Sequence, residues 1–152
     1  MNTDLRELYQ EIILDHNRQP CNFKKLDQAN YVLEGHNPLC GDKITLYLLV
    51  HDNVIKDIGF QGEGCAISRA SASLMTEAVK GKTVEEARNI FQSFHENMTS
   101  VNHHPVSWSK LSVLSNVKQF PMRVKCATLA WQTLISMIDE HGRLAKQNAG
   151  WR

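Results

Sequence analysis

The sequence lacks the features that mark a secreted or membrane-spanning chain. Its first residues, MNTDLRELYQ, carry charges at Asp4, Arg6 and Glu7 and contain no apolar core of a signal peptide. No run of about 18 apolar residues occurs, so no transmembrane helix is expected. These absences predict a cytoplasmic protein, where thiols are normally kept reduced, and they disfavour a disulfide role for the cysteines.

A charge excess of either sign is also missing. The 17 basic and 16 acidic residues give a net charge of +1, and the basic residues are scattered among acidic neighbours. Proteins that bind nucleic acids usually carry a basic patch or stripe. We therefore expect neither a nucleic acid nor a membrane as a partner.

Hydrophobic periodicity predicts an α+β fold. Apolar residues spaced three and four apart predict helices over 4–17, 66–79, about 84–94, 110–117 and from Pro121 onward. Runs rich in strand-forming residues predict strands over 30–35, 43–50 and 54–61, the last two joined by a turn at 51–53. Because no crossover helix separates the strands, we expect a small, mainly antiparallel three-stranded sheet packed by helices.

The chain shows no internal repeat and no linker that would divide it. We therefore expect one domain over residues 1–152, which is long enough to bury a core of its own. Residues 95–109 show no period and are predicted to form a loop. The tail from about Leu144 is predicted to fray.

The four cysteines include no CxxC pair, which excludes a zinc ribbon and a thioredoxin-like motif. Cys21, Cys40, Cys65 and Cys126 are separated by 19, 25 and 61 residues, so a site that they share must be assembled by folding. Cys21 follows Pro20 and precedes a polar run, and we interpret it as a structural residue. The seven histidines show no ligand spacing and are interpreted as surface residues.

Two of the other cysteines flank the predicted hairpin. Cys40, in the segment NPLCGD, enters the first hairpin strand, and Cys65, in GEGC, follows the second. The two strands are antiparallel, so this entry and this exit lie at the same end of the sheet. Residues 40–42 and 65 are therefore predicted to be neighbours. Cys126 falls in the first turns of the last helix, and periodicity alone leaves its position relative to them open.

If Cys126 joins the others, then Cys40, Asp42, Cys65 and Cys126 form a set of three thiolates and one carboxylate. Zinc accepts sulfur and oxygen ligands in tetrahedral geometry, and thiolates also suit iron–sulfur clusters. The carboxylate is a harder and weaker partner for a soft ion, whereas structural zinc sites usually carry cysteine and histidine. The pattern therefore indicates a metal site that can open.

Four segments in this order carry a resemblance to a known family: LYQEIILDHNRQP, NPLCGD, GEGCAISRASASLM and FPMRVKCATLAW. Over nearly its whole length the chain resembles the U-type iron–sulfur cluster assembly family, to which NifU-like and IscU-like proteins belong. It is more similar to the SufU branch than to the IscU branch. Lys125 stands where the IscU branch has a histidine, FPMRVK does not match the chaperone motif LPPVK, and the SufU branch shares the long segment between Cys65 and Cys126.

The resemblance implies site residues and a function. Cys40, Asp42, Cys65 and Cys126 match the family's metal ligands, and Cys40 matches the thiol that accepts sulfur from a SufS-type cysteine desulfurase. Arg123 matches an arginine of the SufU branch near the site. The resemblance thus implies a zinc-dependent sulfurtransferase that passes sulfur to downstream iron–sulfur assembly proteins.

Two alternatives remain open at this stage. The same thiolates would also hold a [2Fe–2S] cluster, which would make the protein a non-enzymatic scaffold that hands the cluster to apo-proteins. The domain would otherwise be an interaction protein with a structural zinc that only activates a desulfurase.

Overall fold

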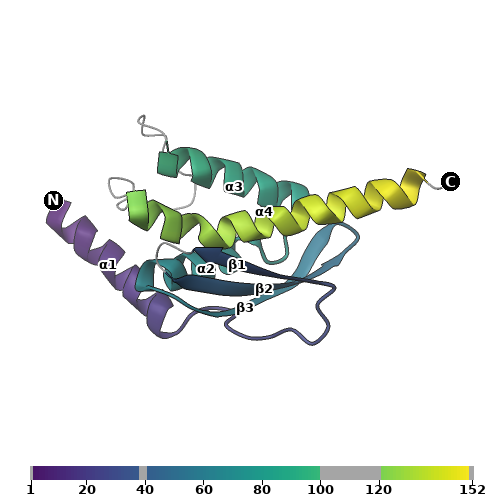
Figure 1. The fold of residues 1–152 in the computed structure, drawn as a ribbon. Helices are drawn as coiled ribbons and strands as arrows, with labels where there is room; N and C mark the ends of the chain where they lie inside the picture. Colours follow the sequence, from purple (N-terminus) through teal and green to yellow (C-terminus); the bar gives the residue numbers. More distant parts are fainter. Residues whose placement is uncertain (1, 38–40, 100–120, 151–152) are drawn as a thin grey trace.

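The computed structural model describes residues 2–37, 41–99 and 121–150, and it describes the side chains of residues 10–37, 41–96 and 123–142 (Figure 1). Its elements are α1 (Asn2–Arg18), β1 (Tyr31–Asn37), β2 (Asp42–His51), β3 (Val54–Glu63), α2 (Ala66–Val79), α3 (Val84–Thr99) and α4 (Pro121–Gly150). The described strands form one sheet in the order β1-β2-β3, with both pairs antiparallel. The predicted α+β class and the antiparallel sheet are confirmed.

The β2–β3 hairpin fixes the register of the sheet. Its turn residues, Asp52 and Asn53, have φ values of 53° and 61°. Positive φ at both central residues is typical of a type I′ turn, whose twist matches that of the flanking strands. His51 pairs with Val54 beside the turn, and the ladder continues to the pair Lys43 and Glu63 at the far end.

Helices α2 and α4 cover one face of the sheet, α3 packs outside α4 and against α2, and α1 packs on α2 (Figure 1). Alternation along β2 directs Ile44, Leu46, Leu48 and Val50 to the covered face, where all four are buried. Trp131 of α4 is fully buried and stacks on Phe94 of α3, with ring centroids 4.5 Å apart. The last predicted helix therefore buries the face that its periodicity indicated.

Helix α3 begins as predicted but ends later. The Thr83 amide donates to Glu86 Oε1 and the Glu86 amide donates to Thr83 Oγ1, both at 3.0 Å, and the pair forms a capping box. The predicted loop over 95–109 is wrong at its start, because α3 continues to Thr99. His95 stacks on Phe91 one turn earlier and so extends the helical face. The rest of that loop and the helix predicted over 110–117 lie outside the described residues.

Helix α4 extends to Gly150, beyond Leu144, from which the tail is predicted to fray. The segment RLAKQNA after Gly142 is rich in residues with high helix propensity, and it contains no proline. Local propensity therefore carries the helix onward.

Side-chain hydrogen bonds join α4 to the sheet at the end away from Asp42. The Tyr31 hydroxyl lies 2.7 Å from His141 Nδ1, and His141 Nε2 lies 2.8 Å from Asn53 Oδ1. These contacts connect α4 with the start of β1 and with the hairpin turn. The axis of α4 is thereby anchored over the sheet.

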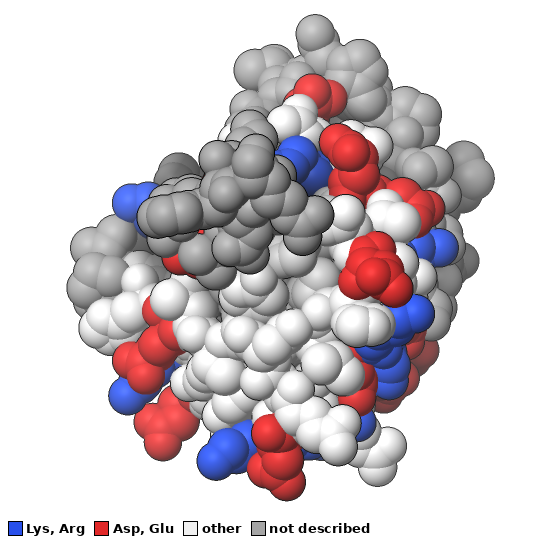
Figure 2. Space-filling model, turned by 90° about the vertical axis from the view of Figure 1, so that its right-hand side faces the viewer, with Lys and Arg blue, Asp and Glu red and all other residues white. Residues whose placement is uncertain are grey.

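The surface is mixed in charge, as the net charge of +1 requires. On the face shown in Figure 2, acidic and basic side chains lie close to one another around a central stretch of uncharged residues. Within the described part of the chain, no helix combines the length and apolarity needed to cross a membrane.

Close approach of α4 to β1 yields a stability prediction. A Cβ added at Gly35 would overlap Thr133 Oγ1 and come within 3.2 Å of Ile44 Cγ2. Gly35→Ala is therefore expected to lower the free energy of unfolding by about 1–3 kcal/mol, the usual cost of overpacking a core. Equilibrium urea unfolding measures this.

The double variant Gly35→Ala/Thr133→Ala provides the control. Thr133→Ala removes the hydroxyl in the way, although it also loses the hydrogen bond to the Leu129 carbonyl. We expect the double variant to lose less free energy of unfolding than the two single variants lose together, because the effects of contacting residues are not additive. Additive effects would show that the close approach does not limit this position.

Candidate metal centre

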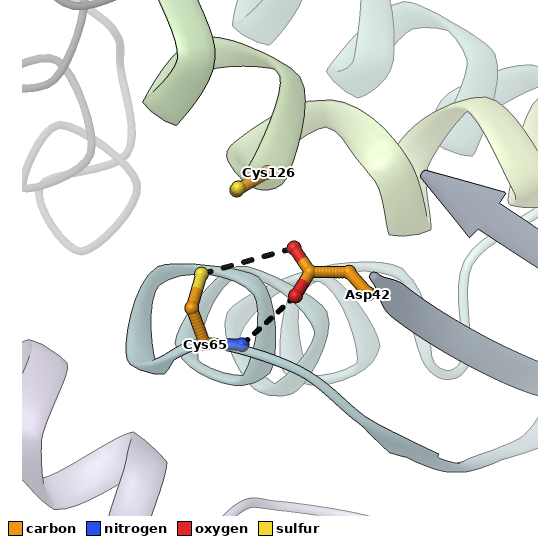
Figure 3. A group of neighbouring side chains, drawn as sticks. All are labelled: Asp42, Cys65 and Cys126. Atoms are coloured by element: carbon orange, nitrogen blue, oxygen red, sulfur yellow. Dashed lines mark hydrogen bonds between the residues drawn. The ribbon is translucent and has the colours of Figure 1, made fainter. Parts of the chain in front are cut away.

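Three side chains from three different elements converge at one end of the sheet (Figure 3). Asp42 is the first residue of β2, Cys65 precedes α2 directly, and Cys126 lies in the second turn of α4. One ligand atom of each lies within 4.8 Å of the others. Two sulfurs and one carboxylate oxygen thus face a common point.

The hairpin brings the first two together. Lys43 of β2 pairs with Glu63 of β3, so the residues just outside this pair, Asp42 and those after Glu63, lie at the same end. Cys65 follows after only one further residue, Gly64. The prediction that this part of the chain neighbours Cys65 is confirmed for Asp42.

Packing between α2 and α4 places Cys126. The Ser71 hydroxyl of α2 donates to the carbonyl of Ala127, the residue after Cys126, and Trp131 Nε1 donates to Ser71 Oγ at 3.2 Å. Ser71 is fully buried, so these bonds fix the relative position of the two helices in the core. Sequence analysis missed this serine, because α2 buries several hydroxyl residues and nothing in the sequence distinguishes Ser71 from Ser68 or Ser73.

Asp42 is almost completely removed from solvent, with 2% of its surface exposed. Its Oδ1 accepts a hydrogen bond from the Cys65 amide at 3.0 Å, and its Oδ2 lies 3.8 Å from Cys65 Sγ. A buried carboxylate is costly unless hydrogen bonds or positive charge compensate it. The amide compensates one oxygen and leaves the other directed toward the two thiols.

The two cysteines differ in their access to solvent. Cys65 is exposed and caps α2, its Sγ accepting a hydrogen bond from the Ser68 amide at 3.4 Å. Cys126 is buried, with 5% of its surface exposed. The cluster therefore opens to solvent on the Cys65 side and is closed by α4 on the other.

The donor set fits a tetrahedral zinc ion. With Zn–S near 2.3 Å and Zn–O of 2.0–2.2 Å, tetrahedral ligands lie roughly 3.5–3.8 Å apart. The 3.8 Å between Cys65 Sγ and Asp42 Oδ2 meets this spacing. All three ligand atoms lie within 4.8 Å of one another, so binding would need them to move together by only about 1 Å. Three protein donors also leave one position for a fourth ligand.

The other predicted site residues are Cys40 and Arg123. Cys40 lies outside the described residues, two positions before Asp42 in the sequence. Arg123 is exposed in the first turn of α4, three residues before Cys126 and hence on the same side of the helix. Cys21 is not in the cluster, and its Sγ lies 3.4 Å from Glu77 Oε2.

The cluster predicts which thiols bind a metal. Anaerobic titration of the metal-free protein with Co²⁺ is expected to give an absorption band from thiolate-to-cobalt charge transfer. Cys65→Ala and Cys126→Ala should each weaken this band and reduce affinity by more than the roughly 10–100-fold that loss of an outer hydrogen-bond partner causes. Cys21→Ala is the matched control and should titrate like the unaltered protein. A band that survives both single substitutions unchanged would contradict the assignment.

Comparison with known proteins places the fold and the cluster in context. The profile of the NifU-like N terminal domain family matches residues 8–141. The chain is 39% identical over 134 residues to the zinc-dependent sulfurtransferase SufU of Bacillus subtilis, covering 88% of this chain and 90% of that protein. It is 43% identical over 136 residues to the iron–sulfur cluster assembly scaffold protein IscU of Thermotoga maritima, covering 90% and 96%.

A solved structure agrees with these relatives. The crystal structure of FiSufU from Fervidobacterium islandicum AW-1, described as an iron–sulfur cluster assembly scaffold protein for the SUF system, superposes with a TM-score of 0.79. The two chains are 37% identical, and the match covers 84% of this chain and 94% of the other. Sequence profile, relatives and fold agree, and the chain belongs to the NifU-like N-terminal domain family.

Proposed function

We propose that this protein acts in iron–sulfur cluster assembly as a zinc-dependent sulfur acceptor. The observation that carries the proposal is the convergence of Asp42, Cys65 and Cys126 on one point, two residues along the chain from Cys40. The likeness to a relative named as a zinc-dependent sulfurtransferase supports it. The same relationship supports the coarser statement, a role in iron–sulfur cluster assembly, whichever metal the cluster holds.

Cys40, Asp42, Cys65 and Cys126 are the proposed ligands. Chain connectivity keeps the Cα of Cys40 within about 7.6 Å of that of Asp42, because consecutive Cα atoms are 3.8 Å apart. A fourth ligand from this position would complete the tetrahedron that the three described donors begin. When bound, zinc would hold its cysteine ligands deprotonated.

The proposed reaction is transfer of one sulfur atom from a cysteine desulfurase of the SufS type. The Cys40 thiolate attacks the terminal sulfur of a persulfide on the desulfurase cysteine. The S–S bond of that persulfide breaks, its cysteine leaves as a thiolate, and a new S–S bond forms on Cys40. The proton stays on the transferred sulfur, and no net oxidation occurs.

Arg123 is proposed to assist this transfer through its charge. Its exposed guanidinium lies on the side of α4 that carries Cys126. Positive charge near a thiolate favours the ionised, nucleophilic form. Cys65, which is exposed, marks the side from which a partner protein would approach.

The scaffold remains the second candidate, and a specific observation favours it. The chain is 43% identical to a protein named as an assembly scaffold, and thiolates of this kind also hold [2Fe–2S] clusters. Metal and acid-labile sulfide measured in protein purified without oxygen separate the two. About one zinc per chain without sulfide supports the acceptor, whereas iron with matching sulfide supports the scaffold.

Replacement of Cys40 tests the transfer step itself. The protein is incubated with a SufS-type cysteine desulfurase and ³⁵S-cysteine, and label bound to this chain is measured after non-reducing electrophoresis. Cys40→Ala is expected to abolish labelling, because the accepting nucleophile is gone, while Cys21→Ala is expected to retain it.

Two outcomes would redirect the assignment. Label retained by Cys40→Ala would overturn Cys40 as the acceptor. A Cys40→Ala protein that carries no label but still raises desulfurase turnover to the unaltered level would favour an interaction protein that activates the enzyme allosterically. Turnover of the desulfurase, followed as alanine released, is therefore measured in the same samples.

A further inference from the structure

The carboxylate of Asp42 lies beside Gly64, at a position that a side chain on residue 64 would crowd. Its Oδ1 accepts the hydrogen bond from the Cys65 amide, and the residue that precedes this amide is Gly64. A Cβ built on Gly64 would lie 3.0 Å from Asp42 Oδ1 and 3.3 Å from Asp42 Cγ. Real Cβ atoms rarely approach so closely, so the carboxylate would have to shift.

The added methyl group would also approach a second neighbour closely. On its other side it would lie 3.3 Å from Cβ of Ser68, which is 7% exposed and belongs to the first turn of α2. Ser68 is itself held, because its amide donates to Cys65 Sγ. The carboxylate of Asp42 is therefore the group that must give way.

Backbone conformation does not explain a glycine at this position. The glycines with positive φ in the described chain are Gly41, Gly62 and Gly81, and Gly64 is not among them. Its φ is not in the region that requires glycine, and the contacts with Asp42 and Ser68 are what oppose an alanine at residue 64. The absence of a side chain at residue 64 thus leaves the Asp42 carboxylate room for its present position.

We propose that Gly64 is a positioning residue for the metal centre: its missing side chain lets the Cys65 amide hold Asp42 Oδ1, so that Oδ2 alone is presented beside the cysteine sulfurs. Figure 3 shows the two oxygens in separate contacts, Oδ1 with the Cys65 amide and Oδ2 with the Cys65 sulfur, so Asp42 would offer a metal one oxygen of fixed direction. This inference rests on the proposed function, since it concerns the same metal centre.

The test compares two alanine variants whose new methyl groups meet different surroundings. Gly64→Ala crowds Asp42, whereas Gly142→Ala in α4 meets no atom within 4 Å and is the matched control. Co²⁺ affinity is measured by competition with a chromophoric chelator. Gly64→Ala is expected to raise the dissociation constant roughly 10–100-fold, and Gly142→Ala is expected to change it less than about twofold. Equal constants in the two variants would overturn the inference.

A double-variant cycle shows whether Gly64 acts through Asp42. In an Asp42→Ala background the methyl group at residue 64 has no carboxylate to displace, so the added substitution is expected to have no further effect. An undiminished effect in that background would overturn the positioning role. If the unaltered protein bound no Co²⁺ through Cys65 and Cys126, the metal centre itself would be overturned.

Hydrogen exchange covers the case in which Gly64→Ala does not fold. The Cys65 amide is expected to be protected in the unaltered metal-free protein, and Asp42→Ala is expected to remove this protection while leaving the amides of β2 and β3 protected. A fast-exchanging Cys65 amide in the unaltered protein would show that Asp42 Oδ1 is not held, and would overturn the inference.

Discussion

The hydrogen bond from the Cys65 amide to Asp42 Oδ1 connects two of the three elements that make the centre. It joins the start of β2 to the residue that caps α2, and it lies where the hairpin ladder ends. A carboxylate with 2% of its surface exposed needs such a partner, since burial without one is costly. The metal centre therefore depends on the hairpin register, because a slip of one residue would turn Asp42 to the opposite face of the sheet.

The same bond gives the two carboxylate oxygens different roles. Oδ1 accepts a hydrogen bond from the Cys65 amide at the N-terminus of α2, and Oδ2 faces the sulfur of Cys65. An oxygen donor held in this way is well placed but remains a harder and weaker partner for a soft ion than a thiolate. The centre thus combines firm geometry with one weak bond, a combination suited to a metal site whose ligands exchange during a reaction.

Sequence periodicity was sufficient for the type and order of the described elements, though not for the end of α3, and for one of the two contacts in the centre. The proximity of Asp42 and Cys65 follows from strand direction alone, because antiparallel neighbours share their ends. The place of Cys126 could not be obtained in this way, because it depends on the contact of Ser71 with the backbone of α4. The sequence pattern within one helix does not show against which residue of another helix it packs. The close contact of Gly64 with Asp42 was equally hidden, because the space around a glycine exists only in the folded chain.

The arrangement also separates the donors by the way in which they are supported. Asp42 and Cys65 are hydrogen-bonded to each other. Cys126 belongs to α4, which is held by hydrogen bonds to Ser71 near the centre and from His141 to Tyr31 at the other end of the sheet. Cys40 instead belongs to the short connection between Asn37 and Asp42, which are paired across β1 and β2. Sites built on helices and strands are held more precisely than sites on loops. Three donors held by the ends of β2, α2 and α4 would keep an ion in place if the proposed fourth ligand, Cys40, left it, and the proposed sulfur acceptance on Cys40 needs such an arrangement.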